Sequence, residues 1–216
     1  MPELSFVEMR RRAHPAMTFV GSTAGASAVE FALVLPVMLT LLVGMSEMAH
    51  AIDNWRKVTL LGRTVADLTS QGDSSDPIAS TTMTDIMGAS SAVLRPFGTA
   101  NVKIVVSALG VDTTASVTSP RVCSSIATSN AKARVTGIAS DLTIPVGFNT
   151  NGNRYVIAEV TMPYSPMVGA SLVKFATGSG TITVSSVFPW PVRNGAIHNS
   201  KTSTPEVTMP GGAPCP

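Results

Sequence analysis

Residues 24–51 read AGASAVEFALVLPVMLTLLVGMSEMAHA, and this stretch decides the architecture of the chain. Within it, the run from Phe31 to Met45 is uncharged, and the whole stretch is long enough to cross a bilayer as a helix that rises about 1.5 Å per residue. A carboxylate in the hydrocarbon region costs about 3 kcal/mol unless it is neutralised, so Glu30 requires an explanation. The sequence therefore predicts a transmembrane helix over residues 26–51 with a carboxylate near its start.

Three interpretations fit this segment. It can be a plain signal anchor, with Glu30 at the headgroup boundary. It can be a removable signal peptide, because Ala49-His50-Ala51 fits the small-x-small cleavage pattern. It can also be a prepilin-type segment, in which Gly25 precedes the cut and Glu30 lies at the start of an apolar helix.

The residues GASAVEFALVLP support the third interpretation. They resemble the start of TadE-like and TadG-like pseudopilins of tight-adherence (Flp) pili, and the resemblance extends from Gly25 to about Gln71. It implies that a membrane-embedded aspartyl prepilin peptidase cuts after Gly25 and leaves Ala26 as the new N-terminus. It also implies that Glu30 and Phe31 mediate subunit pairing, since a free α-amine and a neighbour's carboxylate would neutralise each other where neither is tolerable alone.

The same resemblance implies the partners and the location. The expected partners are other pilin and pseudopilin subunits, the prepilin peptidase, the pilus assembly platform and the inner membrane. Charge alone does not settle the orientation, because Arg10, Arg11 and Arg12 before the span are balanced by Arg56, Lys57 and Arg63 after it. The prepilin pattern and the cysteines favour a cytoplasmic N-terminus, a periplasmic C-terminal domain and incorporation into an extracellular pilus.

We expect an α+β, pilin-like fold in which the membrane helix continues as an amphipathic stalk. Its predicted inner face recurs every three or four residues, at Ile52, Trp55, Val58, Leu61, Val65 and Leu68. Trp55 suits either the membrane interface or the core under a sheet. The expected parts are a cytoplasmic leader (1–25), the transmembrane helix (26–51), a periplasmic stalk with a second helix (52–97), an antiparallel β domain (98–193) and a coil tail (194–216).

Thr82, which is followed three residues later by Asp85, resembles the N-cap of a second helix that runs to about Leu94 and ends before Arg95-Pro96. Alternation of side chains predicts strands over 102–108, 155–162 and 181–188, and a further strand over 133–144. Between them, 111–130 is a connection rich in Ser and Thr, and Asn151-Gly152 is typical of a hairpin turn.

The chain has two cysteines, Cys123 and Cys215, whose spacing matches no metal motif. An even number in an exported protein favours one disulfide, and the alternative is two unpaired thiols. Closing a loop of about ninety residues would remove about 4 to 5 kcal/mol of unfolded-state entropy in the chain model.

Composition and motifs argue against an enzyme. The formal charge of +2 offers no broad field for nucleic acid. His14 is expected in the cytoplasmic arm, His50 at the membrane exit and His198 in the tail, so the three cannot readily meet. Asp73 and Asp76 are expected to be solvated turn carboxylates, so we expect no metal and no cofactor. The expected function is a minor pseudopilin, and the alternative is a secreted or periplasmic binding domain released after Ala51; a periplasmic hydrolase is the weakest option.

Overall fold

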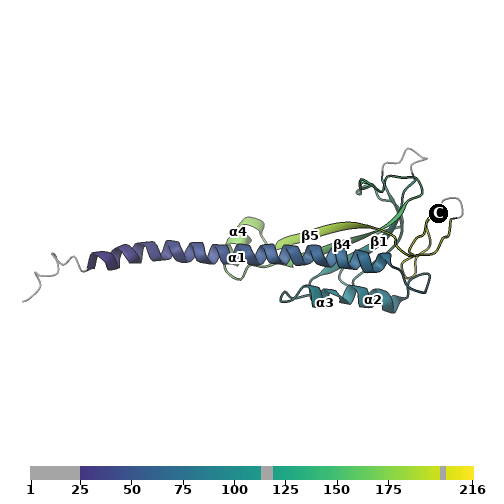
Figure 1. Ribbon diagram of the computed structural model, residues 1–216. Coiled ribbons are helices and arrows are strands. Elements are labelled where there is room, and N and C mark those ends of the chain that lie inside the picture. The colour runs from purple at the N-terminus through teal and green to yellow at the C-terminus, as the bar shows by residue number, and fades with distance from the viewer. Residues whose placement is uncertain (1–24, 113–118, 200–202) are drawn as a thin grey trace, which may run out of the picture. The chain divides into compact units, whose positions relative to one another are not determined.

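The computed structural model describes residues 25–112, 119–199 and 203–216 (Figure 1). The expected cytoplasmic leader, with Arg10, Arg11, Arg12 and His14, lies outside the described residues apart from Gly25. The chain divides into two compact units, Met1–Ser46 and Glu47–Pro216. The elements are α1 (Ala26–Ser70), α2 (Ser80–Gly88), α3 (Ser90–Val93), β1 (Lys103–Gly110), β2 (Arg121–Ala127), β3 (Gly137–Ile138), β4 (Arg154–Tyr164), α4 (Ala170–Thr177) and β5 (Ile182–Pro191). This confirms the predicted α+β class with a long N-terminal helix.

The first helix ends at Ser70, so the predicted continuation to about Gln71 is confirmed. Its buried stripe in the second unit differs from the predicted face. Ile52, Trp55 and Leu68 are exposed, and the stripe consists of Asn54, Val58, Leu61, Gly62, Val65, Ala66, Thr69 and Ser70. The predicted residues Val58, Leu61 and Val65 at the centre of the face are buried. Small and polar residues are buried beside them, where the sheet lies close to the helix.

The predicted second helix is two helices. It begins at Ser80, not beyond Thr82, and no side chain caps it. Its start is instead organised from outside, because the carboxylate of Asp73 accepts a hydrogen bond from the N–H of Ala79 at 3.0 Å. The helix then breaks after Gly88, a weak helix former, and α3 follows.

The second unit also contains one antiparallel sheet of five strands, in the order β3-β2-β1-β4-β5. The strands predicted over 102–108, 155–162 and 181–188 are confirmed as β1, β4 and β5. Two predictions are wrong. The segment expected as a Ser/Thr-rich connection contains β2, and the strand expected over 133–144 is only the two residues of β3.

A hydroxyl pair explains why β2 escaped prediction. Ser107 and Ser125 form a side-chain hydrogen bond of 2.8 Å between β1 and β2, so small polar residues occupy interior positions without an alternating apolar pattern. The turn at Asn151-Gly152 exists, but it is not a hairpin turn, because β4 pairs with β1 and β5. Gly152 instead donates its N–H to the carbonyl of Val111 at 2.9 Å.

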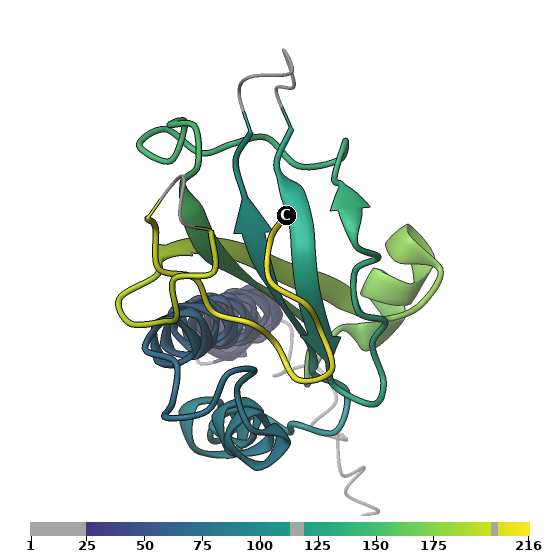
Figure 2. The ribbon, with the colours of Figure 1, turned by 90° about the vertical axis from the view of Figure 1, so that its right-hand side faces the viewer.

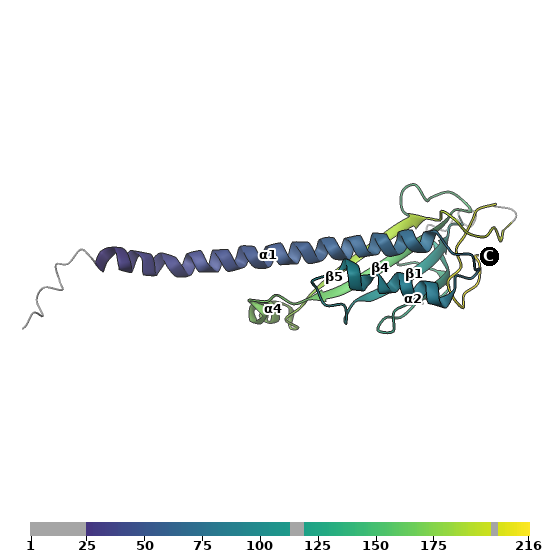
Figure 3. The ribbon, with the colours of Figure 1, turned by 60° about the horizontal axis from the view of Figure 1, so that its bottom comes forward.

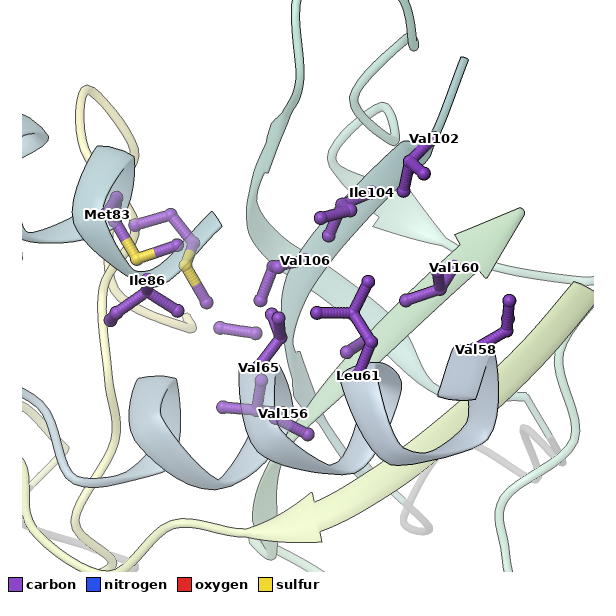
Figure 4. Close-up of a cluster of buried hydrophobic side chains, with 14 of the residues drawn as sticks. Val58, Leu61, Val65, Met83, Ile86, Val102, Ile104, Val106, Val156 and Val160 are labelled. Carbon is purple, nitrogen blue, oxygen red and sulfur yellow. The ribbon is translucent and has the colours of Figure 1, made fainter. Parts of the chain in front are cut away.

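The main core lies between one face of the sheet and the helices α1 and α2 (Figure 2). Figure 4 shows Leu61 and Val65 of α1 facing Val106 of β1, with Met83 and Ile86 of α2 alongside. A smaller cluster packs on the sheet's other face, and it consists of Leu109, Val111, Val122, Ala139, Tyr155 and Ile157. The two faces of β4 thus enter different clusters, as its alternation predicts.

The C-terminal segment is packed against the domain although it forms no helix or named strand among its described residues. Val207 and Met209 belong to the main core, and the N–H of Met209 donates to Ser124 Oγ at 3.0 Å. A disulfide joins Cys123 of β2 to Cys215. Beside it, Glu206 accepts a hydrogen bond from the N–H of Cys215 at 3.0 Å.

Candidate functional site

The part of α1 in the first unit exposes apolar side chains on all of its faces. Every residue from 25 to 46 is exposed, and an 18-residue window of α1 has a mean hydropathy of 2.2. The exposed large side chains of this part include Val29, Phe31, Leu33, Leu42 and Met45. Among the described residues, α1 is the one helix long and apolar enough to cross a membrane, so it is a candidate single membrane span.

The predicted processing and pairing residues lie at the start of this helix. Ala26 is the first residue of α1, and Gly25 stands immediately before it with open space where a side chain would be. Glu30 follows Ala26 by four residues, which places the two on the same face one turn apart. Phe31 is 64% exposed. This end of the helix therefore presents a carboxylate and an aromatic ring on an otherwise apolar surface.

A second carboxylate, Glu47, escaped the sequence analysis. Its Oε1 accepts a hydrogen bond from the N–H of Val168 at 2.8 Å, and its Oε2 accepts one from the N–H of Met167 at 3.2 Å. The hydroxyl of Tyr164 donates to Oε2 at 3.3 Å. Burial raises the pKa of Tyr164 above its ordinary value, and the nearby Glu47 charge adds to that rise.

The sequence contained a signal for Glu47. It lies only two residues after Met45, the end of the apolar run, where a carboxylate needs a polar partner as much as Glu30 does. In the structure, that partner is the backbone that follows β4. The carboxylate thereby fixes the segment after β4 against the point where the helix enters the second unit.

An open apolar groove of about 430 Å³ begins next to Glu47. Its lining residues are Met48, Ala51, Ile52 and Trp55 of α1, Tyr164 of β4, and Ile182, Thr183, Val184 and Ser185 of β5. Trp55 is 61% exposed, so the interpretation of this residue as part of the core is wrong. The groove presents apolar side chains and an indole to the surroundings.

A comparison with known protein families finds a match along most of α1. Residues 25–67 match the TadE-like protein family. This confirms the resemblance seen in the sequence and associates the chain with the tight-adherence pilus system. No curated protein and no solved structure matches the chain.

The TadE-like segment, residues 25–67, carries the candidate span, Glu30, Glu47 and the helical wall of the groove. The TadE-like family consists of pilus-related structural proteins, and the match associates this segment with interaction with other pilus components. The sheet, α4 and the C-terminal segment lie outside the match.

Several titratable residues outside the TadE-like segment have structural partners. Arg134 pairs with Glu159 at 2.5 Å and with Asp141 at 2.8 Å, and its hydrogen bond lowers the pKa of the Asp141 carboxyl. His198 contacts Asp76 at 2.5 Å.

A buried ion pair of 3.5 Å joins Arg154 to Glu206 beside the disulfide. Within the described residues, no three His, Cys, Asp or Glu side chains gather as metal ligands. These pairs hold loops and the C-terminal segment together.

Proposed function

We propose that this chain is a minor pseudopilin of a tight-adherence pilus, anchored in the inner membrane by residues 26–51. The match of residues 25–67 to the TadE-like family carries the proposal. It is supported by an apolar helix whose first residue is Ala26 and which presents Glu30 one turn later. The partners we propose are other pilin and pseudopilin subunits, the prepilin peptidase and the pilus assembly platform.

In this proposal, the prepilin peptidase cuts after Gly25. The free amine of Ala26 then pairs with the Glu30 carboxylate of a neighbouring subunit, and Phe31 packs beside that pair. Both charges would be costly alone in hydrocarbon, so their neutralisation sets the register between helices. The arrangement needs a helix that begins at the new N-terminus and is bare of other protein contacts, and residues 26–46 are exposed along their whole length.

The orientation we propose has a cytoplasmic N-terminus and a periplasmic second unit. The disulfide between Cys123 and Cys215 supports it, because disulfides form and persist in the bacterial periplasm and are rare in the cytoplasm. The buried ion pair of Arg154 and Glu206 is next to that disulfide. The ion pair and the disulfide together hold the C-terminal segment against the rest of the proposed periplasmic domain.

Release of the second unit by signal peptidase after Ala51 is disfavoured by two observations. Ala49, His50 and Ala51 lie inside the continuous helix α1, whereas cleavage sites are presented as extended chain. Such a cut would also remove Glu47, which binds the backbone of Met167 and Val168.

The N-terminal residue and intact mass of the protein from the membrane fraction test the proposal, in cells that carry the complete pilus operon. We expect Ala26 as the first residue. An N-terminus at Ile52 would mean a released periplasmic protein and would overturn the proposal. An intact Met1 would contradict processing after Gly25.

A further inference from the structure

The segment that Glu47 binds, residues 165–177, exposes large apolar side chains that the proposed function does not use. Met167 is 80% exposed, Val168 is 57% exposed and Phe175 is 94% exposed. Such side chains normally lie inside a protein, and when several stand in one short segment they mark a contact surface. The second unit thus has an apolar projection formed by the loop after β4 and by α4 (Figure 3).

The hydrogen bonds of Glu47 hold this projection close to the end of the apolar run of α1. Glu47 follows Met45, the last residue of the apolar run, by two residues, so it stands within about 7 Å of the end of that run. The headgroup layer on each side of the hydrocarbon core is about 5 to 7 Å thick. Because Met167 and Val168 donate their N–H groups to Glu47, their backbone is held at the same level.

The chemistry of the projection fits a lipid surface. The sequence from Ser165 to Thr181 contains no acidic residue, and its one charged residue, Lys174, is exposed. An exposed cation beside apolar side chains is the composition of interfacial helices, in which the apolar groups enter the headgroup boundary and the cation attracts phosphate. Gly169 and Gly178, both with positive φ, begin and end α4 as a separate short helix.

The apolar groove continues the same surface along α1. Met48 and Ile52 are exposed, and Trp55 lies eight residues beyond Glu47, about 12 Å along a helix. At this distance Trp55 stands beyond the headgroup layer, at the far end of the groove from Glu47. The groove and the projection together present Met48, Ile52, Trp55, Met167, Val168 and Phe175 to the surroundings.

We propose that residues 165–177 form a second membrane contact, which lies on the bilayer surface and is held at headgroup level by Glu47. This inference rests on the proposed anchoring by residues 26–51. The contact would fix the tilt and rotation of the second unit on the membrane, because a single helix leaves both free. Its occupant is lipid, and Phe175 is the side chain that enters deepest.

Photolabelling of the unmodified full-length chain tests this. The protein is reconstituted into vesicles of phosphatidylcholine and phosphatidylglycerol in which a fraction of the acyl chains carries a diazirine. After irradiation, mass spectrometry locates the lipid adducts. We expect adducts on 26–46 and on 165–177, with about tenfold fewer on 139–150.

The loop 139–150 is the matched control, because its Val146 is fully exposed and apolar while Phe148 packs on Tyr155 near the opposite end of β4. Adducts on 26–46 without adducts on 165–177 would overturn the second contact and leave the anchor intact, and a protein subunit would then be the occupant. Absence of adducts from 26–46 would contradict the anchor itself.

A variant pair gives a second measurement. Phe175→Glu should reduce adducts on 165–177 by about tenfold without changing those on 26–46, because a carboxylate is disfavoured in the headgroup boundary. Val146→Glu should change neither. An unchanged adduct yield in Phe175→Glu would contradict the insertion of this helix.

Discussion

The Oε1 atom of Glu47 accepts a hydrogen bond of 2.8 Å from the N–H of Val168, which lies 121 residues later in the chain. Glu47 belongs to the TadE-like segment, and Val168 belongs to the connection between β4 and α4 outside it. This contact therefore joins the helix matched by the family model to a part of the domain outside that match.

Glu47→Ala should free the segment after β4. The carboxylate binds two N–H groups and the Tyr164 hydroxyl, and its loss should cost about 1 kcal/mol of unfolding free energy at this partly exposed site. Hydrogen exchange should accelerate at the amides of Met167 and Val168. Glu47→Gln keeps one acceptor oxygen and should show a smaller effect. Equal exchange in the parent and in Glu47→Ala would contradict the anchoring role.

The two tyrosines should titrate above their ordinary range. Burial raises the pKa of Tyr155 to about 12. The pKa of Tyr164 is also raised, mainly by burial and to a smaller extent by the charge of Glu47. Since the folded pKa of Tyr155 exceeds the unfolded value of about 10, its stabilising contribution is complete below pH 10. Stability should fall by about 2 to 3 kcal/mol as the pH rises from about 10 to 12.

Tyrosinate absorbance and denaturant unfolding at several alkaline pH values measure this. In a Tyr155→Phe background only Tyr164 remains, and Glu47→Gln should then lower its pKa. An unchanged pKa of Tyr164 after Glu47→Gln would show that the charge of Glu47 does not affect that pKa.

Gly62→Ala should destabilise the second unit although alanine is the better helix former. A Cβ at position 62 would stand 2.5 Å from the ring of Phe188 on β5. Overpacking of this kind costs about 1 to 3 kcal/mol, which exceeds the helix-propensity gain of about 1 kcal/mol. Gly88→Ala is the control, because nothing lies within 4 Å of its Cβ position. Thermal unfolding should rank Gly62→Ala below the parent and Gly88→Ala at or above it.

Replacing both cysteines by alanine should loosen the C-terminal segment. The disulfide closes a loop with a sequence separation of 92, for which the chain model gives about 4 to 5 kcal/mol. Unfolding free energy should fall by about that amount, and exchange should accelerate at Met209, whose N–H binds Ser124. Unchanged protection at Met209 would show that the core contacts of this segment suffice without the covalent link.

Glu30→Ala should impair pilus assembly while the second unit folds normally, since the proposed pairing with Ala26 needs the carboxylate. Glu30→Gln should be equally impaired if charge is what matters, and Val29→Ala should assemble as the parent does. Pilus yield is measured alongside proteolytic resistance of the second unit. Normal piliation by Glu30→Ala would exclude the pairing role.

Local signals predicted much of this fold correctly. The alternation in β1 and β4 is strong because each strand packs apolar side chains on the main core, and the helical spacing around Val58, Leu61 and Val65 has the same cause. β2 was missed because its Ser125 hydroxyl pairs with Ser107 of the neighbouring strand β1, and no local pattern in the sequence shows such a pairing. The break after Gly88 and the short β3 likewise depend on packing partners distant in the sequence.

The apolar span, the residues Gly25, Ala26 and Glu30 at its start, and the TadE-like resemblance can all be read from the chain alone, because they are contiguous and the bilayer acts on them as one helix. Only the tertiary structure decided the roles of Glu47 and Gly62. Glu47 accepts hydrogen bonds from backbone that only the fold brings close to it. The absence of a side chain at Gly62 matters only because the ring of Phe188 fills that space. Both depend on contacts with residues more than one hundred positions away.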